Sequence, residues 1–145
     1  MIPGKKDGNM KIIVIDGQGG NIGRQLVKNI REVFPEVYIR AVGTNSTATA
    51  NMLKGGANEA ATGENAMIVA CRQADVIIGP IGIAVADALL GEVSAKMAEA
   101  VGKADAVRIL IPLNRCDVLV PGVSDKSTGE LLNDAMKMIR DIMNG

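Results

Sequence analysis

The sequence contains no histidine and no tryptophan, and it has only one tyrosine and one phenylalanine. Without histidine, a His-paired serine or cysteine nucleophile and a histidine metal ligand are excluded. Two aromatic residues are too few to build a base-stacking platform for single-stranded nucleic acid. The two cysteines, Cys71 and Cys116, cannot fill a thiolate zinc site by themselves. We expect them to be free thiols, and the alternative is a disulfide. We expect no metal site built from histidine or cysteine.

Net charge is also absent, because 16 basic residues balance 16 acidic ones. A protein that binds nucleic acid through its phosphates carries a surplus of lysine and arginine, so we expect no nucleic-acid partner. No apolar run approaches the roughly 20 residues that span a bilayer. Residues 1–9 are polar, unlike a signal peptide. We therefore expect a cytoplasmic protein that has no contact with a membrane.

Short apolar runs alternate with amphipathic stretches along the chain. The apolar runs predict strands at 11–16, 37–42, 58–61, 75–79, 106–112 and 117–120. The amphipathic stretches predict helices at 21–33, 46–54, 64–73, 83–90 and 94–103, and a last one from Ser127 to near the end. Polar residues that precede these helices are the expected N-caps, namely Asn45 or Ser46, Thr62, Ser94 and Ser127.

This alternation predicts a doubly wound, Rossmann-like α/β fold, with a mostly parallel sheet of about five or six strands and helices on both faces. A chain of 145 residues suits one domain, and folding would bury roughly 70% of its unfolded surface. We expect a flexible tail at 1–9 and a single domain at 10–145. A dehydrogenase of this type normally has a further substrate-binding region, for which this chain is too short.

The sharpest chemical signal is the segment 16–24, Asp-Gly-Gln-Gly-Gly-Asn-Ile-Gly-Arg, between the first predicted strand and the first predicted helix. Gly17 allows a tight turn, Gly19 and Gly20 leave backbone N–H groups open to a diphosphate, and Gly23 lets the helix pack against the sheet. The positive end of the helix then faces the anion. The segment predicts a phosphate site; the alternative is a structural turn that binds nothing.

Residues 14–27 resemble the fingerprint of extended short-chain dehydrogenases and their non-catalytic relatives, which bind NAD or NADP. That likeness covers only the first strand and helix. The segments 43–46 (Gly-Thr-Asn-Ser), 61–65 (Ala-Thr-Gly-Glu-Asn), 79–82 (Gly-Pro-Ile-Gly) and 111–116 (Ile-Pro-Leu-Asn-Arg-Cys) resemble a small bacterial family of unknown function. This second resemblance runs from Met10 nearly to the end, and it implies a Rossmann-like fold without an established activity.

The sequence departs from the dehydrogenase pattern in two places. In NAD-binding members an acidic residue near the end of the second strand bonds the ribose hydroxyls, but residues 41–46 contain no acid. Thr44, Asn45 and Ser46 would bond a ribose or a 2′-phosphate more weakly. The catalytic Tyr-x-x-x-Lys pair is also absent, because Val42 stands four residues after Tyr38, the only tyrosine. The pattern therefore favours binding over dehydrogenase chemistry.

Three residues are candidates for chemistry. Asp16, at the end of the first strand, is expected to accept N–H bonds from the glycine turn, and the alternative is a Mg²⁺ ligand. Arg115 is either a partner for an anionic substrate group or a solvated side chain. Cys116 beside it is either a reactive thiolate or an inert buried thiol. Cys71, on the apolar side of a helix, is expected in the core.

Ligands of open α/β sheets bind outside the carboxyl ends of the strands. We expect a phosphorylated nucleotide there, NAD or NADP by resemblance, contacting Gly17, Gln18, Gly19, Gly20, Asn21, Ile22, Gly23, Thr44, Asn45, Ser46, Gly79 and Pro80. Valine in place of Gly20 should then abolish binding and leave the fold intact. A loop whose amides are already bonded to the protein's own atoms would contradict the site.

Three classes of function fit the sequence. The favoured one is a module that binds or senses a nucleotide without chemistry. The second is a small oxidoreductase or nucleotide-dependent enzyme, with its active site at the strand tips or a dimer interface. The third is an assembly protein without a ligand. A homodimer is expected, because cyclic dimers are the commonest assemblies.

Overall fold

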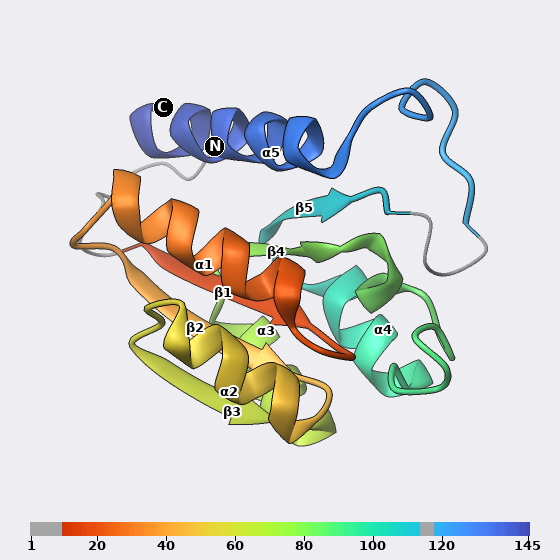
Figure 1. The fold of residues 1–145 in the computed structure, drawn as a ribbon. Helices are drawn as coiled ribbons and strands as arrows, with labels where there is room; N and C mark the ends of the chain where they lie inside the picture. The colour runs from red at the N-terminus through yellow and green to blue at the C-terminus, as the bar shows by residue number, and fades with distance from the viewer. Residues whose placement is uncertain (1–9, 114–117) are drawn as a thin grey trace.

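The computed structural model describes residues 10–113 and 118–145, and its centre is a sheet in the order β3-β2-β1-β4-β5 (Figure 1). All neighbouring strands run parallel. This confirms the doubly wound α/β class, with a wholly parallel sheet of five strands in the described residues. The strands are β1 (Lys11–Asp16), β2 (Tyr38–Gly43), β3 (Glu59–Thr62), β4 (Val76–Pro80) and β5 (Val107–Ile111).

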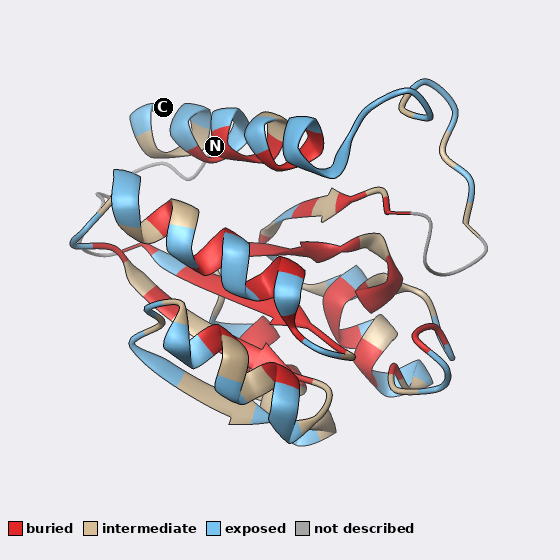
Figure 2. Ribbon diagram, in the orientation of Figure 1, coloured by how far each residue is buried: buried red, intermediate tan, exposed pale blue. Residues whose placement is uncertain are grey.

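The central strand β1 explains why both faces of the sheet are covered. Its β-branched run is buried from Ile12 to Asp16, as Figure 2 shows. Successive side chains point to opposite faces. Val14 accordingly packs in one hydrophobic cluster, and Ile13 and Ile15 pack in the other. A strand that is apolar on both faces must lie between two layers of helices.

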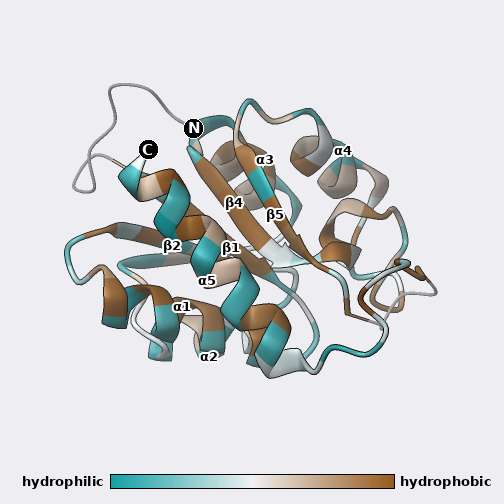
Figure 3. Cartoon of the chain, turned by 90° about the horizontal axis from the view of Figure 1, so that it is seen from above, coloured by the Kyte–Doolittle hydropathy of each residue, from teal (hydrophilic) through white to brown (hydrophobic). Residues whose placement is uncertain are grey.

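The helices form those two layers (Figure 3). Buried residues of α1 (Asn21–Val33), α2 (Ser46–Lys54) and α5 (Thr128–Asn144) belong to one cluster. Those of α3 (Glu64–Gln73) and α4 (Ala95–Lys103) belong to the other.

The order of the strands fixes where a ligand would bind. From β1 the chain moves outward to β2 and β3 through α1 and α2, and α3 then returns it along the other face to β4. The connections therefore diverge between β1 and β4. The crevice outside the carboxyl ends at such a switch point is where ligands of open α/β sheets bind.

Local signals placed most helix ends correctly. The side chain of Asn45 caps α2 by accepting from the Ala48 amide at 2.8 Å, and Ser94 and Ser127 cap α4 and α5. The expected cap at Thr62 is wrong. Gly63 precedes α3 and has no capping side chain, and the Thr62 hydroxyl instead bonds the Thr49 hydroxyl at 2.7 Å.

The expected sixth strand is also wrong. Residues 118–120 form no strand, and Asp117 lies outside the described residues. The Leu119 side chain is 83% exposed, so this apolar run does not enter the core. A strand needs a neighbour for its backbone hydrogen bonds, and the run lies in the long connection between β5 and α5 (Figure 1).

The expected helix at 83–90 is replaced by a short 3-10 helix, η2 (Ile81–Ala84), followed by turns. We call residues 85–93 the β4–α4 connection. Asp87, Leu89 and Leu90 in it have φ of 66°, 57° and 59°. The left-handed region costs such residues about 1–2 kcal/mol each. Burial of Leu89, which is 4% exposed, offsets part of this cost, and its helical spacing could not reveal that contact.

Replacing Gly79 tests how closely β4 and β1 approach each other. A Cβ at Gly79 would overlap the carbonyl oxygen of Ile15, a backbone atom in the middle of the sheet. We expect Gly79→Ala to lower the free energy of unfolding by about 1–3 kcal/mol, because neither strand can move away freely. Urea denaturation measures the change.

Gly102→Ala is the matched control. Gly102 lies in α4, and a Cβ added there would meet no atom within 4 Å, so alanine should stabilise the helix by about 0.5–1 kcal/mol. Equal midpoints for Gly79→Ala and the wild type would contradict the close approach.

Candidate functional site

Residues 17–20 join β1 directly to α1, and we call residues 17–23, which include the start of that helix, the glycine loop. Gly20 is the N-cap of α1 with φ 74° and ψ 16°, and its amide donates to the carbonyl of Gly17 at 2.9 Å. A Cβ at Gly20 would lie 2.7 Å from the Cα of Ala48 in α2. Gly20 is therefore required by its left-handed backbone and by packing. The expectation that valine at this position leaves the fold intact is wrong.

The buried carboxylate of Asp16 holds the two ends of the loop together. One oxygen accepts from the Gly17 amide at 2.8 Å, and the other accepts from the Gly23 amide at 2.7 Å. Only 6% of the residue is exposed. The interpretation of Asp16 as an acceptor for the glycine turn is confirmed. Its charge stabilises the loop from inside, at the N-terminal end of α1.

Side chains around α2 hold the outer edge of the loop. The amide nitrogen of Asn51 donates to the Gly19 carbonyl at 2.9 Å and to the side-chain oxygen of Asn21 at 3.0 Å. The amide nitrogen of Asn45 donates to the Gln18 carbonyl at 2.9 Å. These contacts fix the loop without a ligand, so a bound group would find it preorganised.

The backbone amides of the loop divide into two groups. Those of Gly17, Gln18, Gly20 and Gly23 donate to the protein's own atoms. The amides of Gly19, Asn21 and Ile22 have no acceptor in the described part of the chain. Four of the seven loop amides are thus occupied by the protein's own atoms, contrary to the expected opening at Gly20, and the anion-binding capacity that remains is concentrated around the start of α1.

Glu92, from the β4–α4 connection, is a second acid whose carboxylate touches the glycine loop. Its Oε1 accepts from the Gln18 amide at 2.9 Å, the Thr44 hydroxyl at 2.7 Å and the Asn45 side chain at 2.8 Å. Burial alone would raise the pKa of this carboxyl, but the three hydrogen bonds outweigh it and hold the pKa below its ordinary value. The carboxylate is therefore ionised at neutral pH.

The other predicted contact residues lie in different surroundings. Thr44 follows β2 beside the loop, and its amide donates to the Asp16 carbonyl at 3.1 Å. Ser46 is exposed at the start of α2. Gly79 and Pro80 are buried at the end of β4, and the side chain of Ile22 packs in the core. The structure brings Gln18, Thr44 and Asn45 together around Glu92. Arg115 and Cys116 lie outside the described residues.

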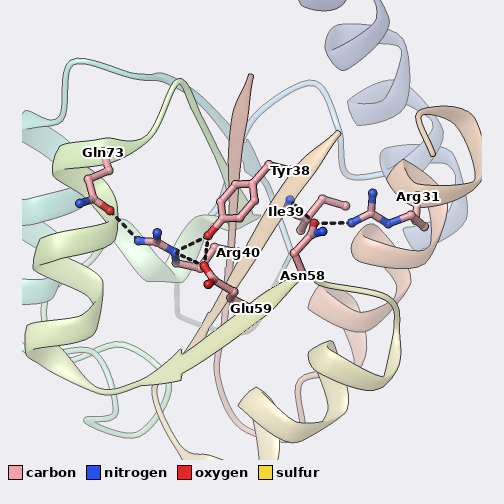
Figure 4. Close-up of polar contacts among 7 residues, drawn as sticks. All are labelled: Arg31, Tyr38, Ile39, Arg40, Asn58, Glu59 and Gln73. Carbon is pink, nitrogen blue, oxygen red and sulfur yellow. Dashed lines mark hydrogen bonds and ion pairs between the residues drawn. The ribbon is translucent and has the colours of Figure 1, made fainter. Parts of the chain in front are cut away.

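Figure 4 shows a separate polar cluster around Tyr38. The Tyr38 hydroxyl donates to Glu59 and accepts from Arg40 Nε at 3.0 Å, and Arg40 also donates to Gln73 at 2.7 Å. Burial, then the bond to Glu59, raises the pKa of Tyr38 against the opposing effect of Arg40. Tyr38 begins β2, whereas the glycine loop follows the other end of the sheet. The cluster therefore joins β2, β3 and α3, and its tyrosine lies away from the loop.

Thiol and metal chemistry find little support in the described residues. Burial raises the pKa of the Cys71 thiol to about 11, so this cysteine is protonated at neutral pH and packs in the core as expected. Within residues 10–113 and 118–145, no cluster of three or more potential His, Cys, Asp or Glu ligands could hold a metal ion. No helix in those ranges is long and apolar enough to cross a membrane.

Sequence reasoning missed Glu92, because residue 92 followed a predicted helix at 83–90 and had no assigned place. A usable signal was available: the end of the second strand lacks an acid, while Glu92 stands beside a glycine that interrupts the chain after the fourth strand. Asn51 was missed as well, since it lay inside a predicted helix with nothing to indicate its contact with the loop.

Residues 11–144 match the family described as Domain of unknown function (DUF3842). The chain belongs to this family. This confirms the resemblance to a family without an established activity. No curated protein matches the chain.

Two solved structures are similar to this family member. One is a universal stress protein from Archaeoglobus fulgidus, at 15% identity and TM-score 0.42, covering 71% of this chain and 93% of that one. The other is a dodecameric FMN-dependent UbiX-like decarboxylase from Escherichia coli O157:H7, at 15% identity and TM-score 0.45, covering 94% and 95%. Likeness at this level carries nothing about ligands or assembly.

Glu92→Gln tests the charge that holds the glycine loop to the β4–α4 connection. Glutamine keeps the shape but loses charge-assisted hydrogen bonds, and we expect a loss of about 1 kcal/mol in the free energy of unfolding near neutral pH. The native pKa lies below the ordinary value of 4.5. The contribution of Glu92 is therefore present above that value and is lost as the pH falls through the native pKa.

Urea denaturation of both proteins between about pH 7 and about pH 3 measures this linkage. The difference between them should shrink towards the acid end. A difference that stays constant across the range would show that the Glu92 charge does not stabilise the loop.

Proposed function

We propose that this protein binds a phosphorylated nucleotide, with NAD or NADP as the expected form, at the glycine loop, and that it acts as a binding or sensing module. One observation carries the proposal. The amides of Asn21 and Ile22, at the positive end of α1, lack an acceptor in the described structure, while the surrounding loop is already fixed by Asp16 and Asn51.

The chemistry of a diphosphate fits this arrangement. Phosphate oxygens accept from backbone N–H groups at a helix N-terminus and gain from its dipole. Arg24 lies on the same first turn, where its guanidinium donates to Asn51 at 2.9 Å and adds positive charge. The loop follows β1, the strand beside the switch point. These features support an anionic ligand that extends across the carboxyl ends of the strands.

The presence of glycine at position 19 favours a ligand-binding loop over a turn that has only a structural role. At Gly17, Gly20 and Gly23 a Cβ would come within 2.8 Å of a neighbour, so packing disfavours any other residue at these positions, most strongly at Gly20, where the neighbour is backbone. Gly19 is exposed, has no left-handed φ, and its Cβ would meet only the Asn21 side chain at 3.6 Å. The fold does not require glycine at this position, whereas close approach of a ligand to the backbone does.

Binding without chemistry is the form that the residues support. The tyrosine that a short-chain dehydrogenase would use lies at the other end of the sheet, in the cluster with Arg40 and Glu59. The thiol of Cys71 is buried and protonated. NAD or NADP would supply its own hydride chemistry if a substrate were present, but the described residues offer it no catalytic acid of the Tyr-x-x-x-Lys type.

Gly19→Val is the direct test. The added methyl groups would cover the approach to the amides of Asn21 and Ile22 without a backbone clash. We expect a thermal midpoint close to that of the wild type and at least about tenfold weaker binding of NAD, NADP and ATP by isothermal titration calorimetry.

Gly102→Val is the control, since it adds the same side chain to an open helix surface and should leave affinity unchanged. Equal affinities of Gly19→Val and the wild type, or no binding of these nucleotides to the wild type, would overturn the proposal.

A further inference from the structure

We infer that Glu92 is the ribose-binding carboxylate of the nucleotide site, and that the protein selects nucleotides with a free ribose 2′-hydroxyl over those with a 2′-phosphate. The inference rests on the proposed function, and it adds the class of ligand and the residue that selects it.

The position of Glu92 is the first argument. In dinucleotide-binding sheets an acid at the end of the second strand accepts from the ribose hydroxyls, next to the diphosphate on the first helix. Residues 44–46 after β2 contain no acid. The carboxylate of Glu92 lies at this place, bonded to Thr44 at 2.7 Å and to Asn45 at 2.8 Å. A residue that follows β4 in the chain thus supplies the group that β2 lacks.

The orientation of the carboxylate is the second argument. All three of its hydrogen bonds end on Oε1, and no donor in the described residues reaches Oε2. Three donors hold Oε1 in place, and the lone pairs of Oε2 stay available. An ionised carboxylate is an acceptor only, so it suits the donating hydroxyls of a ribose. Its first neighbour on the loop, the Gln18 amide, lies three residues before Asn21.

The backbone conformation just before Glu92 also supports the inference. Leu89 and Leu90, which lie shortly before it, have the unfavourable left-handed φ of 57° and 59°, and Gly91 has a φ of 89° that glycine adopts freely. The side chain of Leu89 lies against Gly17, where a Cβ would come within 2.7 Å of it. Unfavourable backbone conformations persist where the surrounding structure enforces them, and they cluster at ligand sites. Here they place one carboxylate on the glycine loop.

Charge explains the expected selectivity. The three donors to Glu92 are an amide, a hydroxyl and a carboxamide, all of them neutral. A 2′-hydroxyl would donate to Oε2, whereas a 2′-phosphate would set two negative groups side by side without a cation among these contacts. NAD should therefore bind more tightly than NADP, and ATP more tightly than 2′-deoxy-ATP.

Isothermal titration of NAD, NADP, ATP and 2′-deoxy-ATP against the wild type and Glu92→Gln tests the inference. We expect the wild type to prefer NAD over NADP by about tenfold, and Glu92→Gln to bring this ratio close to one, mainly through weaker NAD binding. Glu92→Asp, which keeps the charge but withdraws it by one methylene, should give an intermediate ratio. Thermal unfolding checks that each variant folds.

Glu64→Gln is the matched control. Glu64 is the first residue of α3, and its carboxylate accepts a hydrogen bond from the Ser94 hydroxyl at 2.6 Å. Among the described residues it has no hydrogen bond with the glycine loop. Its removal should leave unchanged the preference for NAD over NADP and the preference for ATP over 2′-deoxy-ATP.

The outcomes separate the two proposals. If the ratio of NAD affinity to NADP affinity is the same in Glu92→Gln and the wild type, the ribose role is overturned and nucleotide binding is left intact. An equal gain in affinity for all four nucleotides shows that Glu92 blocks the site, which also overturns it. A wild type that binds none of the four overturns the proposed function, and the role of Glu92 with it.

Discussion

The buried carboxylate of Asp16 organises the carboxyl end of this sheet. It accepts from the Gly17 amide, which directly follows the first strand, and from the Gly23 amide in the first turn of the helix that follows. One side chain therefore fixes the loop at both ends and determines how α1 leaves the sheet. The other contacts of the loop depend on these two hydrogen bonds. They include the packing of α2 against Gly20 and the hydrogen bond from Asn51 to Gly19, and the orientation of the Asn21 and Ile22 amides follows from them.

Two carboxylates accept hydrogen bonds from the amides of the glycine loop. Asp16 lies inside it and is required by the turn itself, whereas Glu92 reaches it from outside and bonds the Gln18 amide. The backbone conformations of Leu89 and Leu90 carry a cost that a plain helix at this position would avoid. A local conformation that is unfavourable and yet delivers a charged group to a preorganised loop is typical of sites that bind ligands.

Much of this architecture could be predicted from the sequence because its causes are local. The buried run of β1, the glycines of the loop and the apolar spacing of α1 each act within a few residues, and their bounds were found. The acceptor role of Asp16 was predicted for the same reason. The non-helical conformation of the β4–α4 connection could not be predicted, because it is set by contacts with Gly17 and Thr44, which lie far away in the chain. The run at 118–120 was misjudged because apolar composition alone does not provide a neighbouring strand.

The hydrogen bond between Gln18 and Glu92 spans 74 positions of sequence, about half the chain. Closing such a long loop costs chain entropy before the contact repays it, so contacts of this kind slow folding. A nascent chain released as far as β3 would already contain Asp16, Asn45 and Asn51, and so the groups that shape the turn. It would lack the acid that joins the two halves of the rim. The proposed ligand site would then be complete only once β4 and the segment that leads to α4 have been synthesised.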